Sequence, residues 1–76
     1  MELQKFVQDF ASQFEETDAE MFAPETRFRD LEEWSSIIGL SIILMVDEEY
    51  GITLEASDVQ KANTIEELFN IVQSKA

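Results

Sequence analysis

Ser35 and Ser36 place two adjacent hydroxyl groups at the head of the most apolar stretch of the chain. A serine becomes a nucleophile when a neighbouring base takes its proton, but the 76 residues include no histidine and no cysteine. The same absences remove the commonest acid/base group, a thiolate zinc site and any disulfide. The sequence therefore indicates that Ser36 is a substrate for another enzyme rather than a catalytic residue.

Carboxylates are the other abundant chemical group, with seventeen acidic residues against five basic ones. A domain of this size offers no deep pocket that would keep a pair of them dry with a raised pKa, as glycoside hydrolysis requires. The run from Asp47 to Gly51 also fails as a calcium loop, because glycine falls fifth instead of sixth and position twelve is Asp58 instead of glutamate. We expect no catalytic residue and no metal site, so the chain is not expected to be an enzyme.

The net charge of −12 restricts the partners that suit the chain. It repels the phosphates of nucleic acid and of anionic membranes, and it favours a protein partner with a basic patch. Met1–Asp9 lacks the continuous apolar segment of a signal peptide, and Ile37–Val46 is far shorter than the about 20 apolar residues of a membrane span. We therefore expect a cytoplasmic monomer without membrane insertion.

The elements that must position Ser36 follow from the spacing of apolar residues. Helical spacing from Met1 to about Glu16 predicts a first helix. Its apolar residues are Leu3, Phe6, Val7, Phe10, Ala11 and Phe14. Thr17–Ser35 has no sustained period and contains Pro24, which predicts a long loop of the kind that is functional or contains a short element. Four apolar residues are expected to hold it on the bundle: Met21, Phe22, Phe28 and Leu31.

A central helix is predicted to begin at Ser35 or Ser36, either of which can be the N-cap, and to end at Gly51, which readily adopts the left-handed conformation. The helical period divides this segment into two faces. The core face is expected to hold Gly39, Ile42, Ile43, Val46 and Tyr50. The outer face is expected to hold Ile37, Leu40, Ser41, Leu44 and Glu48.

Two interpretations of that apolar outer face remain open. Either the helix is buried on all sides, or the face binds a partner protein inside an acidic rim. The rim consists of Glu32, Glu33, Asp47, Glu48 and Glu49.

The C-terminal third predicts two further helices. Ile52–Leu54 alternates briefly but is too short to pair into a sheet. Ser57 is expected to cap a short helix that ends near Lys61, and Thr64 and Glu67 are spaced as a capping box for the last helix. The buried stripe of that helix is Ile65, Leu68, Phe69 and Val72. The predicted fold is all-α, a small four-helix bundle of three longer helices and one short helix with a long first loop.

Trp34-Ser35-Ser36-Ile37, followed by an aliphatic helix and by Asp47-Glu48-Glu49-Tyr50-Gly51-Ile52, resembles the acyl carrier protein family. That family has Asp-Ser-Leu at the head of its second helix and Glu-Glu-Phe-Gly-Ile at its end, and the spacing between them matches without a gap. The likeness extends over almost the whole chain and includes Phe28 and Asp30-Leu31. The chain departs from the family at Ser35, where the family has aspartate, and at Ser41, where many carriers have an acid.

The resemblance implies one carrier domain over residues 1–76 that holds acyl groups as thioesters on a 4′-phosphopantetheine arm. Ser36 matches the attachment serine, since it keeps the spacing to Gly51. Five residues match positions that meet the basic surfaces of phosphopantetheinyl transferase and of acyl-chain synthases, as in fatty acid biosynthesis: Ile37, Leu40, Leu44, Asp47 and Glu48.

Several alternatives stay open beside this interpretation. One alternative is a carrier for amino acids or for a specialised polyketide-type pathway. Another is an acidic helical adaptor without a prosthetic group. Trp34 packs either against the arm or into the loop. Gly39 costs a helix roughly 1 kcal/mol relative to alanine, so it either allows close approach of the long loop or leaves room for an acyl chain between the helices.

Overall fold

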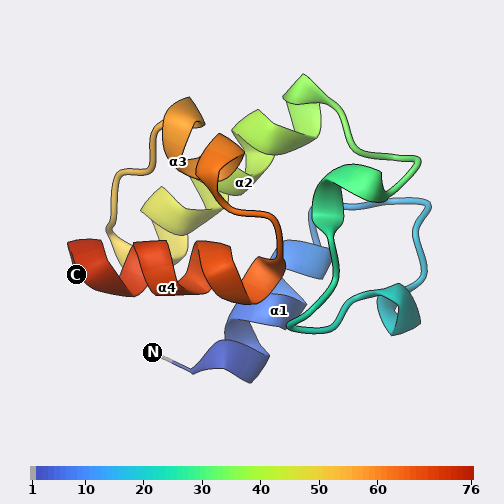
Figure 1. Ribbon diagram of the computed structural model, residues 1–76, viewed down its shortest axis with the longest axis horizontal. Helices are drawn as coiled ribbons and strands as arrows, with labels where there is room; N and C mark the ends of the chain where they lie inside the picture. The colour runs from blue at the N-terminus through green and yellow to red at the C-terminus, as the bar shows by residue number, and fades with distance from the viewer. Residues whose placement is uncertain (1) are drawn as a thin grey trace.

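The computed structural model describes residues 2–76, in which α-helices are the main elements and no strand occurs. The helices are α1 (Leu3–Ala11), α2 (Ser36–Tyr50), α3 (Ala56–Lys61) and α4 (Ile65–Lys75). In Figure 1, α4 crosses the front of the molecule beside α1, α2 runs obliquely behind them, and α3 lies at one end. The predicted all-α fold of three longer helices and one short helix is confirmed. Within residues 2–76 no helix has both the length and the apolar character needed to cross a membrane.

Aromatic side chains fill much of the core. The rings of Phe10 and Phe28 lie 5.3 Å apart between centroids, and those of Phe6 and Phe69 lie 5.4 Å apart. Such tilted pairs contribute attraction beyond the burial of their area. The largest fully buried side chains are Phe6, Phe10, Phe28, Ile42, Ile65, Leu68, Val46 and Val72. The first helix, the long loop and α4 therefore share one apolar interior.

Helix α1 ends at Ala11, five residues before the predicted end at Glu16. The N–H groups of Gln13 and Phe14 bond to Phe10 and Ala11, in turns tighter than an α-helix. The next three N–H groups donate to the Glu33 carboxylate instead of to helical carbonyls. A side chain distant in sequence therefore ends the helix, although Phe14 remains buried as expected.

The long connection between α1 and α2 is tied to the bundle at several points. It contains two short 3-10 turns, η1 (Ala19–Met21) and η2 (Phe28–Asp30). The carbonyl of Pro24 accepts from the N–H of Glu66 at 2.9 Å, and that of Thr26 accepts from the N–H of Ile65 at 3.2 Å. These carbonyls satisfy two N–H groups at the start of α4 that have no partner within the helix.

Of the four apolar residues expected to hold this connection on the bundle, three do so and one does not. Phe22 and Phe28 are buried and Leu31 packs against the core, as predicted. The expectation for Met21 is wrong, because its side chain is 56% exposed. Met21 closes the η1 turn, all three residues of which are exposed.

Helix α2 presents a slightly different face to the core than its period predicts. Ile42 and Val46 are buried as expected, and Met45 joins them. Gly39, Ile43 and Tyr50 are only partly buried, and so is Ser41, which was assigned to the outer face. The corrected core face is centred nearer Met45, because Ile43 turns toward α3 and lines a groove there. Gly51 ends the helix with a φ of 65°, the left-handed conformation predicted for it.

The caps of the last two helices differ in detail from the prediction. Helix α3 begins at Ala56 after Glu55, so Ser57 lies inside the helix and is not its cap. The Asp58 carboxylate accepts from the N–H of Glu55 at 2.9 Å and forms an ion pair with Lys75 at 3.2 Å. The helix therefore starts two residues earlier than it would with Ser57 as its cap.

The predicted box at the start of α4 is half formed. The hydroxyl of Thr64 accepts from the N–H of Glu67 at 3.1 Å, as a capping threonine should. The Glu67 carboxylate accepts from the N–H of Asn63 at 2.6 Å rather than from Thr64. The Glu67 side chain therefore binds the backbone one residue earlier than the box predicts.

Candidate functional site

The two serines at the head of α2 have separate roles. Ser35 is the N-cap, in an extended conformation, and its Oγ accepts a hydrogen bond from the N–H of Ile38 at 3.3 Å. Ser36 is the first helical residue and is exposed. Its hydroxyl has no hydrogen-bond partner within residues 2–76. The cap that the sequence left open is therefore Ser35, and the Ser36 hydroxyl is free to react.

A groove of about 390 Å³ lies beside Ser36, between α2 and α3. Most of its wall is apolar, and one arginine and one glutamine add polar groups. The lining residues are Arg29, Trp34, Ser36, Gly39, Leu40, Ile43, Ala56, Val59 and Gln60. The free hydroxyl thus opens onto a largely apolar channel, the usual character of a site that holds part of a small molecule.

Trp34 forms one wall of this groove and also anchors the loop. Its ring lies 5.0 Å from that of Phe28 and 6.4 Å from that of Phe14, measured between centroids. A Cβ added at Gly39 would lie 3.6 Å from the indole, at ordinary contact distance. The close approach of the loop that Gly39 was expected to permit is therefore present, with Trp34 as the approaching residue.

Arg29 reaches across from η2 to the end of α3. Its Nη1 donates to the carbonyls of Val59 and Ala62, and its Nη2 donates to Asn63 Oδ1 at 2.8 Å. A cation is favourable there, because the last carbonyls of a helix carry partial negative charge. Arg29 therefore fixes the position of α3 against the loop that leads to Ser36.

An apolar strip of Ile37, Leu40 and Leu44 continues from Ser36 along the outer side of α2. These side chains are 73%, 60% and 62% exposed. The interpretation that α2 is buried on all sides is therefore wrong. Asp47 and Glu48 follow the strip, are exposed, and form no ion pair within the part of the chain that the structure describes. One helix thus brings together Ser36 and all five residues predicted to meet partners.

Glu33 does not belong to the acidic rim of this strip. Both of its carboxylate oxygens accept hydrogen bonds from the segment after α1. The hydroxyl of Thr17, together with the backbone N–H of Glu15 and its neighbours, lowers the pKa of this carboxyl below its ordinary value. The sequence pattern assigned Glu33 to the rim by charge alone, whereas its carboxylate is engaged by hydrogen bonds from the chain after α1.

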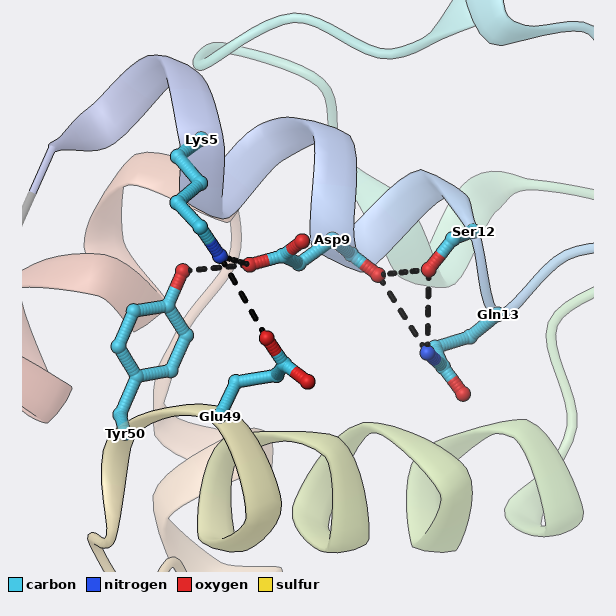
Figure 2. A network of polar contacts seen from close by, with 6 residues as sticks. All are labelled: Lys5, Asp9, Ser12, Gln13, Glu49 and Tyr50. Carbon is cyan, nitrogen blue, oxygen red and sulfur yellow. Dashed lines mark hydrogen bonds and ion pairs between the residues drawn. The ribbon is translucent and has the colours of Figure 1, made fainter.

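The far end of α2 is held to α1 by a polar network (Figure 2). The Tyr50 hydroxyl and the Lys5 ammonium both donate to Asp9 Oδ2, each at 2.7 Å. Lys5 also lies 3.6 Å from a carboxylate oxygen of Glu49. Burial and the bond to Asp9 raise the pKa of Tyr50 to about 12. Glu49 therefore faces α1, and Asp47 and Glu48 remain the free acids at this end.

Two classes of groove residue were not predicted from the sequence. Arg29 follows the recognised Phe28, but nothing in its neighbours indicates that it reaches α3. Ala56, Val59 and Gln60 lie on a six-residue helix whose period is too short to define a face. Their roles depend on tertiary packing, so no local signal would have found them.

The chemistry available to this site is narrow. No general base lies beside Ser36 in the groove, whose ionisable side chain is that of Arg29, a residue type that does not act as a base in proteins. Residues 2–76 contain no group of three or more acidic side chains placed to hold a metal ion. The arrangement suits a serine modified by another enzyme, with a groove for part of the attached group.

A family model described as "Phosphopantetheine attachment site" matches residues 4–72. Neither the curated proteins nor the solved structures give a significant match.

Proposed function

The chain belongs to the phosphopantetheine attachment site family, and on this premise we propose that Ser36 carries the prosthetic group and serves fatty acid or related acyl-chain biosynthesis. Domains of this family hold a covalently attached 4′-phosphopantetheine and are carriers that catalyse no reaction themselves. We further propose that residues 1–76 act as one monomeric carrier domain in the cytoplasm.

The single observation that supports Ser36 as the attachment site is the difference between the two serines in their hydrogen bonds. Ser35 is engaged as the cap of α2, and Ser36 presents an exposed hydroxyl without a partner in residues 2–76. A phosphate on that oxygen would lie at the N-terminus of a helix, where N–H groups and the helix dipole favour an anion. The residues present therefore fit the group that the family carries.

The prosthetic group supplies the thiol that this chain lacks, on which an acyl group is held as a thioester. The protein contributes the attachment point, the groove between α2 and α3, and the exposed strip of α2. We propose that this strip, with Asp47 and Glu48 beside it, binds phosphopantetheinyl transferase and acyl-chain synthases through their basic patches. Exposed apolar side chains edged by acids are complementary to such surfaces.

Incubation with a phosphopantetheinyl transferase and coenzyme A, followed by intact mass measurement, tests the attachment. The wild type is expected to gain the mass of one phosphopantetheine. Ser36→Ala is expected to gain nothing, whereas Ser35→Ala is the matched control and should still be modified. An unmodified wild type with several transferases would contradict the carrier function, and modification of Ser36→Ala would move the site to another residue.

A further inference from the structure

Arg29 has donor capacity that the fold does not use. A guanidinium carries five N–H groups in a planar fork. The two on Nη1 are matched by the carbonyls of Val59 and Ala62, and one on Nη2 by the side chain of Asn63. The N–H of Nε and the second N–H of Nη2 have no acceptor within residues 2–76. Arg29 therefore has two donors to offer a further ligand.

The charge of Arg29 is also uncompensated by any direct partner. The chain has seventeen acids, yet the ion pairs within residues 2–76 involve Lys5, Arg27 and Lys75 as cations. The atoms that Arg29 contacts are two carbonyls and one carboxamide oxygen, all neutral. An arginine stays charged at any ordinary pH. Because no acidic side chain neutralises the Arg29 guanidinium, binding of an anion from outside the protein is favourable at this position.

The same contacts fix the guanidinium in place. Three hydrogen bonds anchor it to α3 and to the turn before α4, and its carbon lies 5.4 Å from the centre of the Phe28 ring. A side chain already held in one conformation loses little entropy when it binds a ligand. Arg29 is therefore preorganised, in contrast to an arginine that moves freely on the surface.

Arg29 and Ser36 line the same groove. We propose that Arg29 binds the phosphodiester that joins the prosthetic arm to Ser36, an inference that rests on the proposed function. A phosphodiester attached to Ser36 is a permanent anion tethered beside the groove, so its effective concentration at Arg29 is high. Paired N–H groups of arginine suit two oxygens of one phosphate. Arg29 is then a positioning residue, because it holds the phosphate end of the arm over the groove between α2 and α3.

The side-chain Nε–H signals in a ¹H–¹⁵N spectrum provide the test, because the chain has two arginines, Arg27 and Arg29. Arg27 is paired with Asp30 at 3.5 Å and is not a lining residue of the groove, so it serves as an internal control. Attachment of phosphopantetheine to the wild type is expected to shift the Arg29 Nε–H signal downfield and to leave that of Arg27 in place. The ³¹P signal of the loaded protein is expected to shift in Arg29→Gln and to stay in Arg27→Gln.

Each other outcome has a definite meaning. Failure to gain the phosphopantetheine mass would contradict the proposed function itself. A loaded protein whose Arg29 signal has not moved would overturn only the inference about Arg29. A signal that moves when the arm carries a succinyl group, but not with the bare arm, would also overturn it, because Arg29 would then bind a cargo carboxylate. If Arg29→Gln does not fold, the comparison of unloaded and loaded wild type still decides.

Discussion

Glu33 Oε1 accepts hydrogen bonds from both the backbone N–H and the hydroxyl of Thr17, at 2.9 and 2.7 Å. The carboxylate also accepts the N–H groups of Glu15 and Glu16, at 2.8 and 3.1 Å. One side chain therefore joins the first residues of the long loop to the last residues before Ser36. The position of Ser36 therefore depends on this contact as well as on the core.

Removal of the Glu33 carboxylate should lower the melting temperature. Glu33→Gln keeps one acceptor oxygen but turns an NH₂ group toward backbone donors, and Glu33→Ala leaves those donors without an acceptor. We expect the alanine variant to melt below the glutamine variant, and both below the wild type. Glu32→Gln, an exposed neighbour with the same change in charge, is the control. A Glu33→Gln protein that melts like Glu32→Gln would show that the contact contributes nothing.

The stabilisation from Glu33 should be lost in acid. The pKa of Glu33 is lowered in the fold from its ordinary value of 4.5, first by the Thr17 hydroxyl and then by the N–H of Glu15. The unfolded chain therefore takes up the proton first as the pH falls. The difference in unfolding free energy between wild type and Glu33→Gln should be constant above the unfolded pKa, shrink below it, and vanish as the pH falls through the folded pKa. Denaturant titrations at a series of pH values measure this difference in unfolding free energy. A difference that grows as the pH falls would contradict the prediction.

The phenol of Tyr50 should lose its proton only at a pH well above the ordinary value for tyrosine. Burial and the hydrogen bond to Asp9 raise the pKa of Tyr50 from 10.0 to about 12. Absorbance of the phenolate reports this residue alone, because the chain has one tyrosine. We expect Asp9→Asn to lower the pKa of Tyr50 but to leave it above the ordinary value, since burial remains. The Tyr50 contribution to stability is complete below the unfolded pKa and is lost as the pH rises through about 12. An Asp9→Asn midpoint equal to that of the wild type would show that the Asp9 contact contributes nothing, and a wild-type midpoint near 10 would contradict the burial of the Tyr50 hydroxyl as well.

Gly39 should tolerate a methyl group, and a larger side chain there should enter the groove. A Cβ would meet the Trp34 ring at 3.6 Å, so Gly39→Ala should raise the free energy of unfolding by up to about 1 kcal/mol through helix propensity. Gly39→Leu should fill the groove that Gly39 lines. If an acyl chain enters there, the acylated Gly39→Leu protein should hydrolyse faster than the acylated Gly39→Ala protein. Equal rates of hydrolysis in the two variants would mean that the acyl chain stays outside the groove.

The strip on α2 should control recognition by the transferase. Leu40→Ser removes apolar contact at a position 60% exposed, while Met21→Ser makes the same kind of change at a position 56% exposed away from α2. We expect kcat/KM for phosphopantetheine transfer to fall roughly tenfold in Leu40→Ser, equivalent to about 1.4 kcal/mol. Met21→Ser should match the wild type, and unchanged melting temperatures would show that both variants remain folded. An equal loss in both would mean that the strip has no special role.

The features predicted correctly from the sequence are those that depend on neighbouring residues. The helical period identifies α2 and α4, Gly51 marks a helix end, and the Thr64 hydroxyl caps α4 as its spacing predicts. The exposed strip also follows from the period, because three aliphatic side chains fall on the side opposite Val46. Local propensity and periodicity carry this information without tertiary contacts.

The features that were missed are set by residues distant in sequence. Glu33 binds backbone N–H groups that lie 16 to 18 residues earlier, and Arg29 binds carbonyls at the end of α3 that lie 30 and 33 residues later. Met45 is buried and Ile43 only partly buried, because Ile43 lines the groove between α2 and α3. A charge pattern cannot distinguish a carboxylate that faces solvent from one that binds backbone donors, so Glu33 was assigned to the wrong role.

The carbonyls of Pro24 and Thr26, which bond to the first residues of α4, also bear on the order in which the chain folds. They come from residues about forty positions earlier, so closing this contact costs chain entropy before it returns any stability. Helix α4 can form transiently beforehand, but its first turn becomes fully bonded only after the long loop has closed on it. Closure of the loop and completion of the first turn of α4 are thus coupled, and we expect that loosening the loop around Pro24 and Thr26 would fray the start of α4.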